Sequence, residues 1–308
     1  MNGQGSVREQ GVAVITAILI MAMAASVASF LAWQQGIWTR QVQNMRDQAQ
    51  AETLAAAGVE WARGILAEDA KEGDTDHPGE AWAQTLAGLE VENGQLGGYI
   101  RDAQARYNLN NLKGSGPIQE RNLAIFKRLL QNLKLNPEIG DRISAWLNPV
   151  TASGGTAAAP VAPTQSGATS GRLLYSANNL YAVEGIARDD LDRLYPYVIA
   201  LPATSPTQIN VNTAPPELLS AVLELPLTQA QALVRARERA PFKGIEDFRA
   251  RLPASVAGVD ESLFNVASQY FLVNSQAMVG RVTMRYRALL NRQGAAWPKV
   301  IWRVPGGA

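Results

Sequence analysis

The sequence predicts an α+β protein in which a long N-terminal helix packs on a small antiparallel sheet and a large all-α insertion interrupts that sheet. Three observations support this class. An uncharged apolar run near the N-terminus continues into a polar, helix-forming stretch. Segments that alternate like strands lie before and after a helical region of about 150 residues. The chain has 308 residues, 47% of them hydrophobic, which is enough for two hydrophobic cores.

The apolar run from Val12 to Trp33 contains no Asp, Glu, Lys or Arg. At 1.5 Å per residue it makes a helix of roughly 33 Å, which spans a hydrocarbon core of about 30 Å. It has no Pro or Gly, and Trp33 and Trp38 lie at its end, where interfacial aromatic residues are common. A cleaved export peptide would have a shorter apolar core followed by a small-residue cleavage site. We therefore expect a membrane-spanning helix over 12–33 with an exported body behind it.

The helical pattern continues past the membrane to about Asp69, with an apolar stripe along a polar helix. A loop follows over 71–80. The stretch 97–112 alternates and ends in Asn-rich turn residues, which predicts a strand or hairpin. We expect residues 34–112 to form the first part of a small helix-and-sheet domain.

A helical region then separates these elements from the terminal strands. Helices are predicted from about Gln119 to Asn148, and strands return only near Gln269. The terminal strands are expected over 269–279, 281–292 and 297–304, with turns near Gly280 and Gly294. The predicted domains are an insertion over 113–266, with a flexible uncharged linker at about 149–171, and the closing strands of the sheet domain over 267–308.

The insertion shows a weak internal repeat. One half begins at PEIGDRISAWLNP and continues through NNLYAVEGIARDDLDRLYPYV. The other begins at TQAQALVRARERAPFKGIEDFRARL and continues through VDESLFNVASQYF. Each gives a helix, a break and a closing helix, which predicts two related helical units.

Charge is distributed unevenly although the formal net charge is only +1. From Glu60 to Asp102 there are ten acidic and three basic residues, whereas from Leu272 onward there are six basic residues and no acid. We expect the two segments to lie side by side in one domain. Contact of the basic tail with anionic lipid is the competing explanation, and it fits less well because the tail alternates like a buried sheet.

A polar leader of eleven residues ends in Gly11 immediately before the apolar run. This arrangement resembles the type IV pilin and type II secretion pseudopilin families. In those families a prepilin peptidase cuts after the Gly, on the cytoplasmic side, and methylates the new amine. The resemblance implies a leader over 1–11, cleavage between Gly11 and Val12, and methylation of Val12.

Thr16 departs from the pattern of these families. Most pilin-like subunits carry Glu at the fifth mature position, where it is thought to pair with the terminal ammonium of a subunit already in the filament. An unpaired charge in an apolar core costs several kcal/mol, so this pairing favours addition beneath an existing subunit. Thr16 cannot supply it, whereas the amine of Val12 can still receive it. We expect a subunit that begins a filament and does not extend one.

The segment INVNTAPPELLSAVLELPLTQAQALVRARER resembles the helix-hairpin-helix family, and the resemblance implies that the all-α insertion contains helix-hairpin-helix (SAM-like) repeats. This resemblance raises an alternative function, that of a membrane-anchored DNA receptor of the competence type. The turn at 225–228 has Pro in place of the usual Gly, which removes an amide donor for phosphate. From Pro206 to Val266 there are seven acids and six bases, without the basic excess of a nucleic-acid surface. We expect Arg235, Arg237 and Arg239 to lie on a solvated face, with no nucleic acid bound.

Several motifs in order strengthen the pilin-like interpretation. The Gly11 signature with Thr16, then QAETLAAAGVEWA, RDAQARYNLNNL, INVNTAPPELL and FKGIEDF, are together similar to the GspK-type minor pseudopilin family of type II secretion. The resemblance implies a protein anchored in the inner membrane, with its body in the periplasm, that assembles at the tip of the pseudopilus. Implied partners are other minor pseudopilins, the major pseudopilin and the prepilin peptidase. The large insertion would clash inside a tightly wound shaft.

Metal and catalytic functions have little support. Some members of this family bind calcium, and relatives carry acids around a segment that reads Trp146-Leu147-Asn148-Pro149-Val150 here. Calcium requires six to eight oxygens, several of them anionic, so we expect no metal site and no cofactor. A further acidic cluster, Asp189, Asp190 and Asp192, does not converge on one point of a helix. Ala105 replaces a Gly of relatives.

Catalysis is not expected either. The chain has no Cys, and its one histidine, His77, lies in an acidic loop. We found no G-x-S-x-G elbow, phosphate loop or dinucleotide fingerprint. The sequence therefore predicts a non-catalytic assembly protein. A third interpretation, a stable inner-membrane protein whose leader is never processed, stays open at this point.

Overall fold

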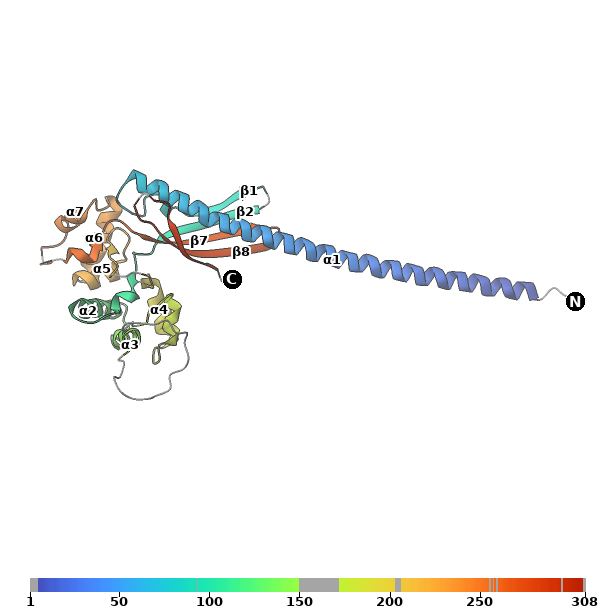
Figure 1. Ribbon diagram of the computed structural model, residues 1–308, viewed down its shortest axis with the longest axis horizontal. Helices are drawn as coiled ribbons and strands as arrows, with labels where there is room; N and C mark the ends of the chain where they lie inside the picture. The colour runs from blue at the N-terminus through green and yellow to red at the C-terminus, as the bar shows by residue number, and fades with distance from the viewer. Residues whose placement is uncertain are drawn as a thin grey trace, which may run out of the picture.

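In the computed structural model the residues described are 5–92, 94–149, 172–202, 206–254, 256, 258, 260–294 and 296–306. One helix, α1 (Gly5–Glu72), is 68 residues long and projects far beyond the rest of the molecule (Figure 1). The predicted membrane segment and the helix of the exported body are therefore one element, as the sequence indicates. Most of the predicted linker lies outside the described residues.

A five-stranded antiparallel sheet packs under the C-terminal half of α1, in the order β1-β2-β7-β8-β9. This confirms the predicted long helix on a small antiparallel sheet. The strands are β1 (Leu86–Val91), β2 (Gly94–Asp102), β7 (Tyr270–Val279), β8 (Val282–Asn291) and β9 (Lys299–Pro305).

The first hairpin differs from the sequence prediction. The stretch 97–112 does not form a hairpin, because β2 ends at Asp102 and pairs back onto β1, which the sequence analysis missed. The pair Asn93-Gly94, a strong hairpin signal, was available to find it. The alternation of β1 was hidden because its residues are mostly exposed and its pairing is irregular between Leu86 and Leu89.

The core between α1 and the sheet depends on small residues along the helix. Ala51, Ala55 and Ala62 are buried, and a Cβ at Gly58 would collide with Ser275 Oγ of β7. Alternate residues of the strands point toward this seam, since the side-chain period of a strand is two. Trp82 closes one end of the core, edge-on to Phe271 with ring centroids 5.2 Å apart.

The insertion between β2 and β7 is helical, as predicted. Its helices are α2 (Pro117–Asn132), α3 (Glu138–Leu147), α4 (Arg188–Leu194), α5 (Pro216–Leu223), α6 (Leu227–Arg239) and α7 (Ile245–Ala250). Two parallel strand pairs of two residues each accompany them, β3 (Tyr107–Asn108) with β4 (Val198–Ile199) and β5 (Ile209–Asn210) with β6 (Phe264–Asn265). The expectation that strands return only near Gln269 is corrected by these pairs, which are too short to leave a period in the sequence.

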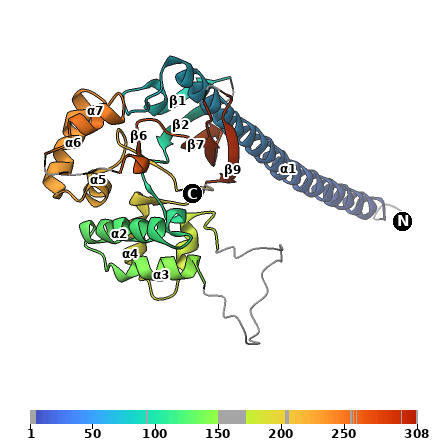
Figure 2. The same ribbon diagram turned by 60° about the vertical axis from the view of Figure 1, so that its left-hand side comes forward.

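The two strand pairs bracket two similar units. In the first unit β3 is followed by α2, α3 and α4 and closed by β4, and in the second β5 is followed by α5, α6 and α7 and closed by β6. Figure 2 shows the two groups of helices one above the other. The sequence repeat paired the second helices, α3 and α6, correctly. It began one helix too late, because the first helices are not similar in pattern.

Asparagines open both units in the same way. The side-chain oxygens of Asn108 and Asn210 accept hydrogen bonds from the backbone N–H two residues on. The next asparagines, Asn110 and Asn212, then each bind both the N–H and the C=O of one distant residue. These distant residues are Leu174 and Phe242. Buried amides that satisfy buried backbone in this way hold loops together without a regular sheet.

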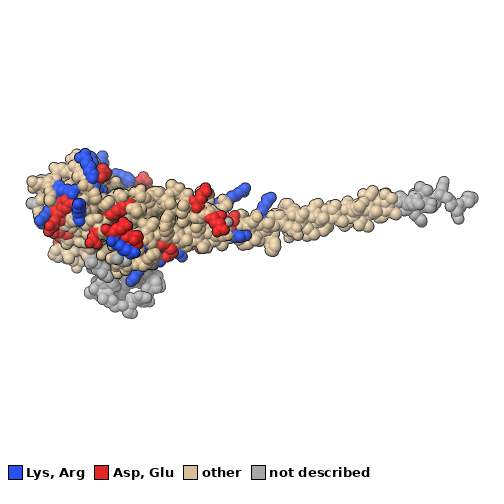
Figure 3. Space-filling view, turned by 90° about the horizontal axis from the view of Figure 1, so that it is seen from above, with Lys and Arg blue, Asp and Glu red and all other residues tan. Residues whose placement is uncertain are grey.

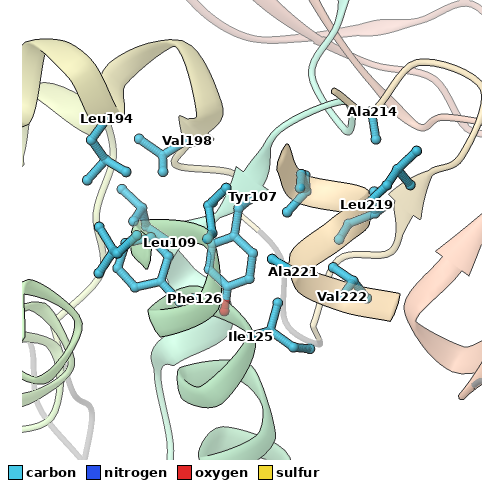
Figure 4. Close-up of a cluster of buried hydrophobic side chains, with 14 of the residues drawn as sticks. Tyr107, Leu109, Ile125, Phe126, Leu194, Val198, Ala214, Leu219, Ala221 and Val222 are labelled. Carbon is cyan, nitrogen blue, oxygen red and sulfur yellow. The ribbon is translucent and has the colours of Figure 1, made fainter. Parts of the chain in front are cut away.

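One hydrophobic core runs through both units of the insertion (Figure 4). Tyr107 stacks on Phe126 with ring centroids 5.1 Å apart, and its hydroxyl donates to the carbonyl of Asn122 at 2.9 Å. The helices α2 and α5, which are the first helices of the two units, pack against each other. The two units therefore fold as one body.

Candidate assembly and junction sites

The projecting half of α1 exposes apolar side chains on every side. Its window of highest hydropathy has a mean value of 2.4, and none of it is buried by the rest of the chain. Ile20 and Phe30 are 66% and 57% exposed, and Trp33 and Trp38 are more than half exposed. The space-filling view shows no charged side chain along the outer described part of this stalk, and Lys and Arg side chains first appear where it approaches the body (Figure 3). Such a surface is stable only in lipid or against other apolar helices.

The predicted assembly residues lie near the free end of this stalk. Gly11 and Val12 are within the continuous α1, which starts at Gly5, inside the predicted leader. Val12 is 60% exposed. The hydroxyl of Thr16 lies 3.0 Å from the carbonyl oxygen of Val12 and 2.9 Å from that of Ala13, so it is satisfied by its own helix. Thr16 offers no negative charge to a neighbouring chain.

A polar site joins the sheet domain to the helical insertion. It lies where the chain passes from β2 into the insertion and returns into β7. Arg292, just after β8, donates to Asp69 of α1 at 2.7 Å and to Asp76 at 2.5 Å. Its guanidinium also lies over the Phe271 ring, 4.6 Å from the centroid. Asp76 is 1% exposed, so this is a buried ion pair that tethers the end of α1 to the sheet.

Asp102 is the centre of the same junction. Its carboxylate accepts from Asn210 Nδ2 at 2.9 Å, from Ser268 Oγ at 2.7 Å and from the Thr213 hydroxyl, while the backbone N–H of Gln104 donates to its other oxygen. Burial raises the pKa of Asp102 from 3.8 to about 6, and these hydrogen bonds offset only part of the effect. Both crossings between sheet and insertion are therefore fixed by one polar network.

The charge asymmetry of the sequence is explained by this network. The expectation that the acidic and basic segments lie side by side is confirmed, since β2 pairs with β7 and Arg292 pairs with Asp69 and Asp76. The sequence did not single out Asp102 or Arg292 as junction residues. The signal available was the Asn-rich start of each unit, because such residues serve buried backbone.

His77 and the acids around it belong to this junction loop. Carboxylate oxygens of Asp69, Asp76 and Glu80 lie within 4.8 Å of one another. The Arg292 guanidinium already bridges two of these acids, and the N–H of Trp82 donates to Glu80. A metal ion would have to displace this cation.

In the described part of the segment that the family resemblance assigns to calcium, the polar side chain of Asn148 is already engaged within the fold. The side-chain oxygen of Asn148 accepts from the N–H of Gly114 at 2.8 Å, and its amide donates to Leu112 and Ser144 carbonyls. Val150 and the segment after it lie outside the described residues. In α4, Asp192 accepts from the Tyr181 hydroxyl at 3.2 Å, whereas Asp189 and Asp190 stand in the first turn.

The predicted helix-hairpin-helix repeats are not confirmed, and the turn between α5 and α6 lacks the Gly and the amide donor of a phosphate-binding hairpin. The turn between them places Glu224 in the left-handed region, with φ of 55°, and Pro226 immediately before α6. Arg237 turns inward and donates to the carbonyl of Val211, and burial lowers its pKa to about 10. Arg235 and Arg239 are exposed on α6. The three arginines therefore do not form one patch for phosphate.

A single long helix, half exposed and apolar and half packed on an antiparallel sheet, defines a pilin-like subunit. Family models described as "Type II secretion system (T2SS), protein K" match residues 105–203 and 209–267. These two matches cover the two units of the insertion in turn. The chain is 30% identical over 287 residues to the type II secretion system protein K of Pseudomonas aeruginosa, with 88% of this chain and 85% of that protein covered. The chain belongs to the type II secretion system protein K family.

Further relatives and a solved structure agree with this assignment. The protein K of Pectobacterium carotovorum is 30% identical over 329 residues and is covered to 97%, as is this chain. The fold is similar to a chain in the crystal structure of the GspK-GspI-GspJ complex from the type 2 secretion system of enterotoxigenic Escherichia coli. The TM-score is 0.70 at 22% identity, with 87% of this chain and 100% of that chain covered.

Proposed function

We propose that this protein is a minor pseudopilin that starts assembly of the type II secretion pseudopilus and stays at its tip, supporting protein export across the outer membrane. The observation that carries the proposal is the exposed apolar half of α1, which can pass from the inner membrane into a bundle of similar helices. Membership of the protein K family indicates that the filament belongs to a type II secretion system. Before assembly, residues 12–33 cross the inner membrane and the body lies in the periplasm.

Assembly begins with removal of the leader. The prepilin peptidase cuts between Gly11 and Val12 and methylates the Val12 amine. Mass spectrometry of the N-terminus tests this step in cells that contain the peptidase. The expected result is a methylated N-terminal Val12, and a Gly11→Glu variant is expected to keep Met1. Wild-type protein that keeps Met1 in such cells would contradict the proposal and favour an unprocessed membrane protein.

Position in the filament follows from Thr16. Thr16 has a hydroxyl in place of a carboxylate, and this hydroxyl donates within its own helix. The residue therefore offers no negative charge to the ammonium of a subunit above. The N-terminal ammonium of Val12 can still form an ion pair with the Glu of a subunit below. Growth from beneath therefore leaves this chain at the top, where its insertion of about 150 residues has room.

The Thr16→Glu variant tests this position directly. We expect it to fold normally and to enter positions below the tip as well, since it regains the missing charge. Cysteine crosslinking of subunit order is the readout, and Thr39→Glu, at an exposed position of the same helix, is the matched control. An unchanged order in the Thr16→Glu variant would count against the charge argument.

The expected partners at the tip are two other minor pseudopilins, followed below by the major pseudopilin. The similar solved chain was crystallised in a complex named GspK-GspI-GspJ, which supports the first of these. We further propose that the sheet domain, 34–112 with 267–308, and the insertion, 113–266, act as one rigid tip and that neither is catalytic. Copurification of the full-length chain with candidate minor pseudopilins tests the partnership.

A further inference from the structure

The sheet has one face that α1 does not cover. Leu96, Ile100, Phe271 and Val273 point toward α1, so the residues between them in β2 and β7 point the other way. Ile199 and Leu201 of the insertion cover one end of this opposite face, where they pack on Leu289. On the rest of the face Tyr99, Gln276 and Arg287 are exposed.

The strand register gathers arginines on the open part. One row across the strands is Tyr99, Asn274, Arg287 and Val304, in that order. The next row on one side begins with Arg101, which pairs with Leu272. In the next row on the other side Gln276 pairs with Arg285. Arg106, from the turn after β2, lies close enough to Arg287 for their charges to interact. We call these four arginines, Arg101, Arg106, Arg285 and Arg287, the arginine face.

The arginine face carries positive charge that the described part of the chain does not pair with an acid. Among the residues that the structure describes, none of its four guanidinium groups forms an ion pair. Burial and the positive charge of Arg287 both lower the pKa of Arg106. On the strands, the nearest acid that points to this side is Glu90, which is paired with Gln95 at the hairpin end of the sheet. Repulsion among the arginines is relieved when an anionic partner binds.

The surroundings suit a protein partner. Tyr99, Met278 and Val304 are 40%, 39% and 45% exposed and add apolar area among the charges. The Arg101 guanidinium lies over the Tyr99 ring, 5.1 Å from its centroid, and Arg285 is oriented by Gln276 at 2.9 Å. Arginine with tyrosine is typical of the energetic centre of protein interfaces, because arginine binds carboxylates with two parallel hydrogen bonds.

Distance argues against a lipid surface. Gly58 of α1 packs at the level of Ser275, next to the row that contains Arg287. With 12–33 in the bilayer, the helix from Trp33 to Gly58 has a length of about 38 Å. Attraction to anionic headgroups is screened within about 8 Å at physiological salt. The arginine face of an upright subunit is therefore several screening lengths away from the membrane.

We propose that the arginine face is a docking surface for an acidic protein surface on a neighbouring subunit of the pseudopilus tip. This inference rests on the proposed function. The neighbour contributes Asp and Glu side chains at the spacing of the arginine rows, and the contact fixes the rotation of this chain about α1. The same face stays unoccupied in the inner membrane until the tip complex forms.

Charge reversal tests the inference in the full-length, membrane-extracted protein. The variant is Arg285→Glu with Arg287→Glu, and Arg101→Glu is a second, single-site variant that does not touch Gln276. The matched control is Arg235→Glu with Arg239→Glu, on the exposed side of α6. Copurified minor pseudopilins are quantified for each, and circular dichroism and melting temperature check the fold. We expect at least a tenfold loss of copurified partner for both face variants and no change for the control.

Different outcomes separate the inference from the function on which it rests. Copurification that is equal for wild type and both face variants overturns the arginine face and leaves the proposed function standing. Absence of any minor pseudopilin with the wild-type chain overturns both. Vesicles containing phosphatidylglycerol provide the lipid arm. If the face variants lose vesicle binding while keeping their protein partners, the surface binds lipid and the inference is wrong.

Discussion

The two halves of α1 have the same backbone and opposite surroundings. From Val12 to about Arg46 its side chains are exposed, and most of them before Trp33 are large and apolar. From Ala51 to Leu66 one seam of the helix, made of alanines with Val59 and Leu66, is buried in the body. A helix surface that is apolar all round requires a partner outside the chain, whereas a narrow seam is satisfied by its own domain. The composition of each half therefore indicates where its partner lies.

The packed half is also the half that is fastened. Asp69, near its end, reaches Arg292, and Glu52 accepts from the hydroxyl of Tyr286 on β8 at 2.9 Å. The projecting half has no such contact within the described chain. Under the proposed function, movement of α1 would carry the body with it, because the helix and the sheet cannot separate without breaking this seam.

The largest expected effect comes from unfastening the end of the packed half. Arg292→Met leaves Asp76 buried without its cation, which costs about 3–5 kcal/mol of unfolding free energy. Urea unfolding followed by circular dichroism measures it. Lys299→Met, at an exposed position of β9, is the control and is expected to change stability by less than about 0.5 kcal/mol. A loss below about 1 kcal/mol in Arg292→Met would mean that the seam alone holds α1.

A pH series extends the comparison to the junction below the seam. Because the pKa of Asp102 is raised in the folded protein, the folded state binds more protons than the unfolded state between pH 3.8 and about 6. The contribution of this carboxyl to stability is therefore present below pH 3.8 and is lost as pH rises through about 6, by up to about 3 kcal/mol.

The Asp102→Asn variant isolates this contribution. Its deficit relative to wild type should be largest near pH 4 and should shrink toward pH 7. Melting temperatures across that range measure it, with Asp189→Asn on exposed α4 as control. A deficit that grows with pH would show that the ionised form is the favoured one.

Glycine substitutions probe the seam itself. A Cβ at Gly58 collides with Ser275 Oγ and comes within 2.9 Å of Leu96 Cδ1, whereas at Gly64 it meets only the Trp297 ring at 3.5 Å, an ordinary contact. Alanine is favoured over glycine in helices by about 1 kcal/mol. Gly58→Ala is expected to destabilise by about 1–3 kcal/mol, while Gly64→Ala is neutral or stabilising. Equal melting temperatures for the two variants would remove the close-packing argument.

The smallest effect is expected in the projecting half. A Cβ at Gly36 meets nothing within 4 Å. Gly36→Ala should therefore leave the melting temperature of the body unchanged, although it stabilises the local helix by up to about 1 kcal/mol. Heating followed by near-ultraviolet circular dichroism tests this. A shift comparable with that of Gly58→Ala would show that the two halves of α1 are coupled.

Some of the fold was predictable because the hydrophobic residues of its longer helices and strands recur with a regular period. The helical run through α1, the helices α2 and α3 and the alternation of β7 and β8 each extend over several turns or residues, so propensity and pattern agree. The strand β1 was missed because few of its residues are buried. The pairs β3 with β4 and β5 with β6 were missed because two residues carry no period.

The sequence alone determined that an uncharged apolar span of 22 residues precedes a polar helix, that the fifth residue after Gly11 is the uncharged Thr16, and that acidic and basic residues are concentrated in separate segments. These are properties of composition and order, and they survive any arrangement of the chain. Only the tertiary structure decided that Arg292 meets Asp69 and Asp76, that Asp102 is buried at the crossing, and that arginines gather on one open sheet face. Those contacts join residues far apart in the chain, and their energies depend on burial and register, which local sequence does not encode.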